Sequence, residues 1–281
     1  MKPGRESQTA VMVAAARAAA HGRTVGVDFQ DPTALALLPD EARRQVEDFR
    51  SGVAPKDARG RLARQFMDRR SKMMVARTVA IDEAVRAAAT PQVVILGAGL
   101  DGRAWRMPEL RDATVFEVDH PDSQREKQAR AAALQRVARE VRFVPVDFAR
   151  DRLDDALTAA GHDPARPTTW VWEGVVMYLE RPAIEATLAV IQRRSAPGSH
   201  LIVMYVMRSL LLPLIAFLLR RVGEPLRSLF TPDQMRALLA QYGFTVVRDD
   251  GLPAIAARLS AALARDTRVM KHMRVATANR A

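Results

Sequence analysis

The segment VVILGAGLDGRAWRM, residues 93–107, decides how this chain folds. Its first four residues are apolar and predict a buried strand, and Gly97, Gly99 and Gly102 then follow in a G-x-G-x-x-G pattern. Glycines at this spacing turn the chain from a strand into a helix and let a ligand approach the backbone closely. The pattern is typical of sites for adenosine-containing cofactors, but alone it does not distinguish one such cofactor from another.

Strand-like and helical stretches alternate after this segment. The strand-like runs are QVVILG, TVFEVD, VRFVPVD, TTWVWEG, HLIVMYV and FTVVRD, and VMKHMRVAT near the C-terminus is interpreted as an additional edge strand. The helix TPDQMRALLAQYG begins with a capping box formed by Thr231 and Gln234. This alternation predicts an α/β fold, a Rossmann-like, seven-stranded, mostly parallel sheet with helices on both faces.

The chain divides into two predicted regions. Residues 1–90 have helical patterns, including a helix that ends before Pro91, and are expected to form an N-terminal helical lid and substrate region. Residues 91–281 are expected to form the cofactor domain, with an apolar lid insertion around 206–230 that contains a helix over Leu210–Leu219. Arg208 interrupts this apolar stretch and leaves about half of the roughly 20 residues that a membrane span needs, so none is predicted.

Composition excludes some classes of protein. The chain of 281 residues contains no cysteine, which excludes disulfides, thiolate zinc sites and thiol nucleophiles and fits a cytoplasmic location. No metal is expected, and the oligomeric state stays open. The net charge is +11, with eleven basic against four acidic residues between Arg43 and Arg77. Since aromatic residues are not interleaved with these arginines, we interpret the segment as a solvated helical face, and nucleic acid is not an expected partner.

Acidic residues occur where the predicted parallel strands end, the edge at which such sheets bind ligands. Glu117 and Asp119 end the second strand, and a carboxylate there can accept hydrogen bonds from both hydroxyls of an adenosine ribose. Asp147 and Phe148 end the third strand, where they can contact an adenine amino group and ring. Glu173 ends the fourth strand and can pair with an ammonium, which a methyl-sulfonium donor carries and a nicotinamide cofactor does not.

Five motifs in order carry a resemblance to a known family. ART at residues 76–78, LGAGLDGRAWRM, FEVDHP, VDF and WEGVVMYL make the chain similar to the leucine carboxyl methyltransferase-like enzymes, which use S-adenosyl-L-methionine and include bacterial members linked to polyketide and other secondary metabolism. The resemblance implies that the donor is bound by Arg77 at its carboxylate, Gly97 and Gly99 along its length, Asp119 at the ribose, Asp147 and Phe148 at adenine and Glu173 at the amino group, with Glu117 in support. Family members that act on protein phosphatases carry a cofactor-binding lysine near the N-terminus. Residues 7–22 of this chain contain no lysine, and Arg17 is the only cation in the predicted helix there.

The expected activity is O-methylation of a small-molecule carboxylate or hydroxyl, with a slight preference for carboxylate. A hydroxyl acceptor would benefit from a general base such as His120, His162 or Glu173, but no catalytic residue is assigned. The alternatives are an NAD(P)-dependent oxidoreductase and a non-enzymatic, basic nucleic-acid-binding protein. Cytosine C5 methylation is excluded because it needs a cysteine, and WEGV stands where base amino-methyltransferases usually carry an Asn/Asp-Pro-Pro-aromatic run.

Overall fold

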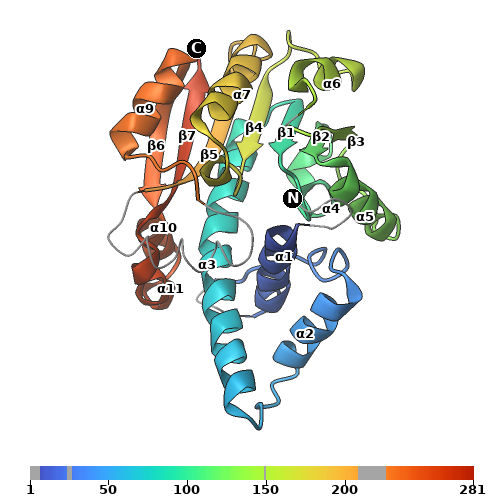
Figure 1. Cartoon of the computed structure of the whole chain (residues 1–281), viewed down its shortest axis with the longest axis vertical. Helices are drawn as coiled ribbons and strands as arrows, with labels where there is room; N and C mark the ends of the chain where they lie inside the picture. Colours follow the sequence, from blue (N-terminus) through green and yellow to red (C-terminus); the bar gives the residue numbers. More distant parts are fainter. Residues whose placement is uncertain (1–6, 24–26, 149, 208–225) are drawn as a thin grey trace.

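A computed structural model describes residues 7–23, 27–148, 150–207 and 226–281 (Figure 1). Seven strands form one sheet in the order β3-β2-β1-β4-β5-β7-β6. The strands are β1 Gln92–Leu96, β2 Thr114–Asp119, β3 Glu140–Pro145, β4 Thr168–Trp172, β5 His200–Val206, β6 Phe244–Gly251 and β7 Met273–Arg280. Strands β1 to β5 are parallel, and β7 is antiparallel to both of its neighbours. The predicted seven-stranded, mostly parallel α/β sheet is confirmed.

The expectation of a C-terminal edge strand is wrong, because β7 lies between β5 and β6. Val275, Ala276 and Ala278 of β7 are buried, as an interior strand requires. The edge position belongs to β6, whose polar RDDG end and β-bulge near Val247 are features that blunt an exposed edge. The small apolar residues of β7 therefore mark it as an inner strand.

Helices cover both faces of the sheet, as predicted. One apolar cluster joins alternate strand residues to α1 (Gln8–Ala20), α3 (Ala58–Ala88), α10 (Leu252–Leu259) and α11 (Ala261–Thr267). The second cluster joins the other strand residues to α6 (Leu153–Ala159), α7 (Arg181–Arg193) and α9 (Pro232–Gln241). The remaining elements are α2 Asp40–Arg50, α4 Arg103–Arg106, α5 Pro121–Ala131, η1 Pro108–Leu110, η2 Val176–Tyr178 and η3 Arg268–Met270. This two-faced core follows from side chains that alternate across each strand.

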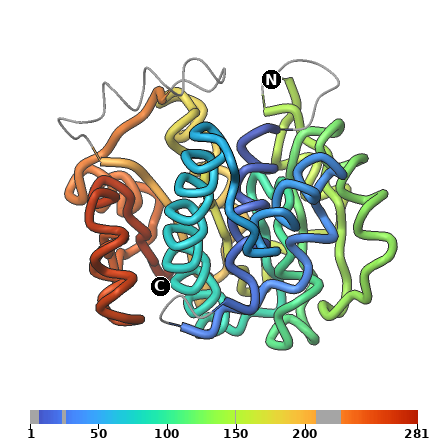
Figure 2. Tube along the Cα trace, turned by 90° about the horizontal axis from the view of Figure 1, so that it is seen from below, coloured from blue at the N-terminus to red at the C-terminus, as the bar shows by residue number. Residues whose placement is uncertain are grey.

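Local sequence signals explain where several helices begin and end. The predicted capping box of Thr231 and Gln234 starts α9. Asp57 starts α3 by accepting a hydrogen bond from the Gly60 amide at 2.6 Å. It ends at Ala88, before Pro91, as expected. Seen from below, α3 lies between α1 and the pair α10 and α11 (Figure 2).

The N-terminal helices lie at the end of the sheet toward which β4 points (Figure 1). They share the first apolar cluster with the sheet, and the division at residue 90 stays a prediction. In the four described ranges, no helix is long and apolar enough to cross a membrane. The predicted lid helix over Leu210–Leu219, with most of the 206–230 insertion, lies outside the described residues.

Candidate donor site

The loop after β1 has a backbone that only glycine adopts easily. Gly97 has φ +70°, and a Cβ atom on it would lie 2.3 Å from Cγ2 of Val175. At Gly99, with φ +48°, a Cβ atom would lie 2.9 Å from the Cβ of Ala10 in α1. A side chain at either position would collide with its neighbours, because the loop is packed between the chain after β4 and the first helix.

Asp119 lies directly against this loop. Its Oδ2 accepts a hydrogen bond from the Gly99 amide, and its Oδ1 accepts one from the His120 amide at 2.6 Å. Burial raises the pKa of Asp119, while these two amides act in the opposite direction. The carboxylate is thus fixed beside the glycine loop, where the sequence places a ribose-binding group.

Arg77 and Glu173 meet although 96 positions separate them in the sequence. Arg77, on α3, donates from Nε to Oε1 of Glu173 at 2.5 Å, and Nη1 of Arg103 lies 2.9 Å from Oε2 of the same carboxylate. Burial alone would raise the pKa of Glu173, but Arg77 and Arg103 outweigh it and hold that pKa well below its usual range. Glu173 is therefore ionised at neutral pH, and an arginine is paired with each of its carboxylate oxygens.

A buried charge network extends from this pair to the N-terminal segment. Asp82 lies 2.7 Å from Nε of Arg103 and 2.6 Å from Nη1 of Arg106. Asp31 accepts from Nε of Arg17 at 2.9 Å, and Nη2 of Arg17 donates to the Leu100 carbonyl at 2.7 Å. The network contains four arginines and four carboxylates, Arg17, Arg77, Arg103, Arg106, Asp31, Asp82, Asp101 and Glu173.

Sequence reasoning singled out Arg17, Arg77 and Glu173 but missed the other members of this network. Its members are scattered from residue 17 to residue 173, and no spacing pattern joins them. One signal in the sequence could have indicated some of them. Asp31, Arg103 and Arg106 are charged residues in apolar or turn-rich segments, and charged residues that become buried are usually paired.

Asp147 and Phe148 follow β3 next to the Asp119 backbone. The amide of Val146 donates to the Asp119 carbonyl at 2.9 Å, which brings the two strand ends together. Asp147 does not cap the helix that follows it, since the N-cap of α6 is Arg152. Phe148 packs against the second apolar cluster and is not fully buried.

Glu117 lies behind the loop rather than at its surface. Its side chain is fully buried, and Oε2 lies 2.6 Å from Nζ of Lys127, which is also buried. The contact is an ion pair without the alignment of a hydrogen bond. Burial raises the pKa of Glu117 to about 7, and Lys127 opposes this rise. The supporting role of Glu117 stays a prediction.

The two histidines considered as bases have structural contacts. His162 is buried next to the start of β4, where its Nε2 lies 3.1 Å from Oγ1 of Thr168, and this is the opposite end of the strand from Glu173. His120 caps α5 by accepting from the Asp122 amide at Nδ1, which leaves the proton of the neutral ring on Nε2. Neither histidine therefore presents a free basic nitrogen at the strand ends.

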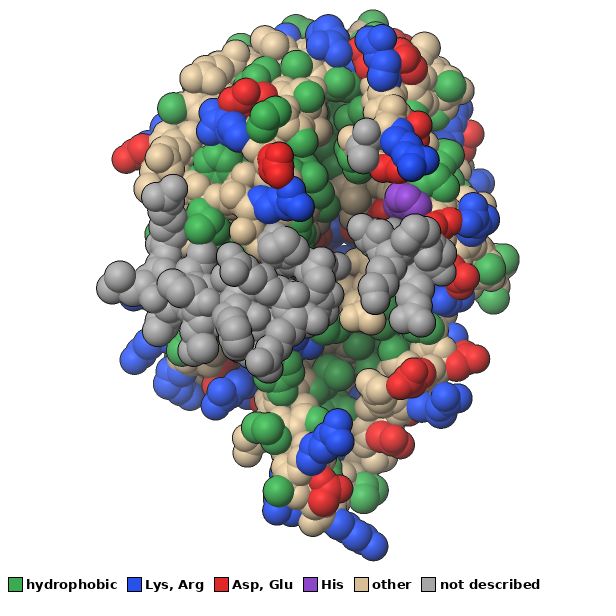
Figure 3. Space-filling view, in the orientation of Figure 1, with side chains coloured by type: hydrophobic (Ala, Val, Ile, Leu, Met, Phe, Trp, Pro, Cys, Tyr) green, Lys and Arg blue, Asp and Glu red, His purple; other side chains and the backbone are tan. Residues whose placement is uncertain are grey.

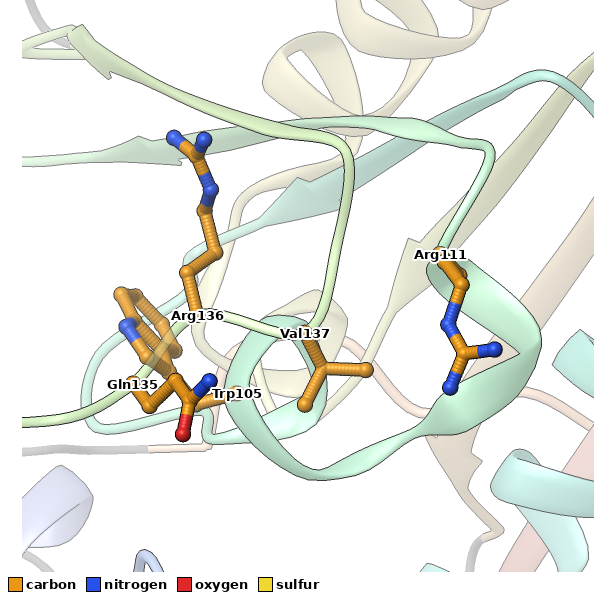
Figure 4. A pocket seen from close by; sticks show the side chains of 5 residues that line it. All are labelled: Trp105, Arg111, Gln135, Arg136 and Val137. Carbon is orange, nitrogen blue, oxygen red and sulfur yellow. The ribbon is translucent and has the colours of Figure 1, made fainter.

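One surface hollow lies beside α4 and contains none of the predicted site residues. It is lined by Trp105, Arg111, Gln135, Arg136 and Val137 (Figure 4). Arg111 and Arg136 extend in different directions from its walls, so their charges do not converge on one point (Figure 4). The hollow is consequently not a second candidate for the donor.

The strand order, the glycine loop with its left-handed backbone and the carboxylates of Asp119 and Glu173 at the strand ends are typical of the S-adenosyl-L-methionine-dependent methyltransferase class. Solved structures support this fold. A structure described as a putative methyltransferase from Thermobifida fusca has a TM-score of 0.60 at 14% identity, over 98% of this chain and 95% of that one. A DUF574 family protein from Streptomyces avermitilis has a TM-score of 0.57 at 14% identity, over 99% of each chain.

The chain belongs to the leucine carboxyl methyltransferase family, whose model matches residues 10–192. A relative from Frankia alni, named as a putative S-adenosyl-L-methionine-dependent methyltransferase, is 35% identical over 72% of this chain and 69% of its own length. A similarly named relative from Mycolicibacterium smegmatis is 38% identical over 69% of this chain and 65% of its own. The match to a Parafrankia relative spans about half of that protein, 49%. The resemblance and the predicted cofactor are confirmed, and the NAD(P) alternative is set aside.

Proposed function

We propose that this protein transfers the methyl group of S-adenosyl-L-methionine to an oxygen atom of a small molecule, with a carboxylate as the preferred acceptor. The observation that carries the proposal is the ionised Glu173 between Arg77 and Arg103 at the end of β4. The donor carries a carboxylate and an ammonium group. Its carboxylate can pair with Arg77, and its ammonium can pair with Glu173.

Each part of the donor has a proposed partner. When Arg77 turns to the donor carboxylate, Arg103 would remain paired with Glu173 and hold its carboxylate in place. Asp119 would accept from the ribose hydroxyls, next to the glycine loop. Asp147 and Phe148 would bind the adenine at the end of the neighbouring strand, and Glu117 would support the loop from behind.

The donor supplies the reactive sulfonium methyl, and the protein's contribution is to align the acceptor oxygen with it. Alignment and exclusion of water supply most of the rate in such a displacement. The N-terminal helices lie at this end of the sheet and are proposed to enclose the acceptor.

The chemistry of the site favours an acceptor that is already ionised. Among the described residues at the strand ends, Glu173 is held ionised by two arginines, and the free nitrogen of neutral His120 carries a proton. Glu117 has a raised pKa but is fully buried. A carboxylate acceptor needs no base, whereas a hydroxyl would need one. A role in secondary metabolism and a cytoplasmic location are parts of the same proposal.

Donor binding and methyl transfer are tested separately. Calorimetric titration with S-adenosyl-L-methionine, its demethylated product, NAD and NADP is expected to show binding of the first two only. A panel of small carboxylic acids, phenols and amines is then incubated with isotopically labelled donor. Base-labile methyl esters are the expected products, and exclusive labelling of nitrogen or of nucleic acid would overturn the O-methylation proposal.

A further inference from the structure

The first half of α3 projects from the molecule. No residue from Ser51 to Arg70 is buried, and the buried residues of this 31-residue helix begin only at Ser71. Figure 1 shows that this half extends below the sheet together with α2. We call the projecting segment, residues 51–70, the prong.

The prong concentrates exposed apolar side chains. Val53, Leu62 and Phe66 are 73%, 68% and 55% exposed, and they are three of the five large apolar residues that are exposed in the described part of the chain. Leu62 and Phe66 are four positions apart on the helix, so their side chains lie on the same face. Exposed apolar side chains grouped in this way mark interaction sites more often than scattered ones do.

Basic side chains surround this apolar group. The prong contains six basic residues, Lys56, Arg59, Arg61, Arg64, Arg69 and Arg70, against Asp57 and Asp68. Asp57 caps α3, and Asp68 is paired with Lys72 at 2.8 Å. Within the described ranges, no carboxylate forms an ion pair with Arg59, Arg61, Arg64 or Arg69. Figure 3 shows basic and apolar side chains together at this lower end of the molecule.

We propose that the prong is a docking surface for an anionic lipid membrane, into which Val53, Leu62 and Phe66 insert while the surrounding arginines contact lipid phosphates. A convex end with few apolar side chains suits a fluid surface, which adapts its shape, better than a protein partner, which needs about 800 Å² of complementary area on each side. Pairing of two copies through the prong would bring like charges together. The net charge of +11 adds attraction toward an anionic surface.

The test uses the full chain and sedimentation with vesicles. Wild-type protein should bind vesicles of about one part phosphatidylglycerol to three parts phosphatidylcholine at least about tenfold more tightly than pure phosphatidylcholine. Raising the salt from about 0.1 M to about 0.5 M should weaken this binding, because it screens exposed charges.

Two matched variants distinguish vesicle binding through the prong from non-specific binding through exposed apolar residues elsewhere. Leu62→Ser with Phe66→Ser should reduce binding to anionic vesicles at least about tenfold, as each inserted side chain contributes buried apolar area. Val247→Ser with Val269→Ser removes two equally exposed apolar residues elsewhere and should leave binding unchanged. All four positions are exposed, and circular dichroism checks that each variant is folded.

Three results would overturn the proposal. Wild-type protein could fail to bind anionic vesicles, the prong variant could bind as well as wild type, or the control variant could lose as much binding as the prong variant. Binding to polyglutamate without binding to vesicles would also overturn it and would indicate an acidic protein partner instead. None of these outcomes depends on whether the protein transfers methyl groups.

Discussion

Replacing Glu173 by Gln tests the proposed donor site most directly. The substitution keeps the size of the side chain but removes the charge that Arg77 and Arg103 share. Both arginines are almost fully buried, at 6% and 3% exposure. Breaking a buried ion pair by removing one partner destabilises a protein by about 3–5 kcal/mol, so the free energy of unfolding in urea should fall by that order.

The same substitution should weaken donor binding. The donor ammonium loses its charged acceptor, and a hydrogen bond to a charged group contributes about 1.5–3 kcal/mol. The dissociation constant for S-adenosyl-L-methionine should therefore rise roughly ten- to a hundredfold. Methylthioadenosine has no amino acid portion, and its dissociation constant should stay the same in the variant.

A second variant controls for lost stability. Asp154→Asn removes a carboxylate that pairs with Arg193 at 3.0 Å and with Arg194, on the opposite face of the sheet. It should lower stability without changing the affinity for the donor. The reasoning is refuted if Glu173→Gln weakens the binding of methylthioadenosine as much as the binding of S-adenosyl-L-methionine. It is also refuted if Glu173→Gln and Asp154→Asn raise the dissociation constant of the donor equally.

Three further predictions concern single positions. Asp119→Ala should raise the donor dissociation constant roughly ten- to a hundredfold in calorimetry, because charge-assisted bonds to the ribose are lost, and an unchanged value would assign this role to another group. Burial, assisted by the Arg194 charge, lowers the pKa of His162 to about 4. The imidazole of His162 binds its proton near pH 6.5 in the unfolded chain and only near pH 4 in the folded one. The free energy of unfolding should therefore keep its full value above pH 6.5 and decrease by up to about 3 kcal/mol as the pH falls to 4. His162→Gln should flatten this pH dependence, measured by urea unfolding at each pH. Gly97→Ala should cost about 1–2 kcal/mol for its left-handed backbone plus the overlap with Val175, and thermal unfolding should show that adding Val175→Ala restores only the second part.

The sequence by itself determined the elements of the sheet and the residues at its carboxyl edge. An apolar run followed by closely spaced glycines specifies a strand, a turn and a helix, because each feature depends on neighbours in the chain. The positions of Asp119 and Glu173 at strand ends follow from the same local pattern. Local pattern alone therefore assigns these residues to one edge of the sheet.

Tertiary structure decided which distant residues become partners. Three features join segments far apart in sequence: the place of β7 between β5 and β6, the contact between Arg77 and Glu173, and the hydrogen bonds of Arg17 to Asp31 and to the Leu100 carbonyl of the glycine loop. The exposed half of α3 is another such case, since its apolar residues resemble core positions until the packing leaves them uncovered. Burial and charge pairing depend on which surfaces meet in space, and sequence spacing does not record that.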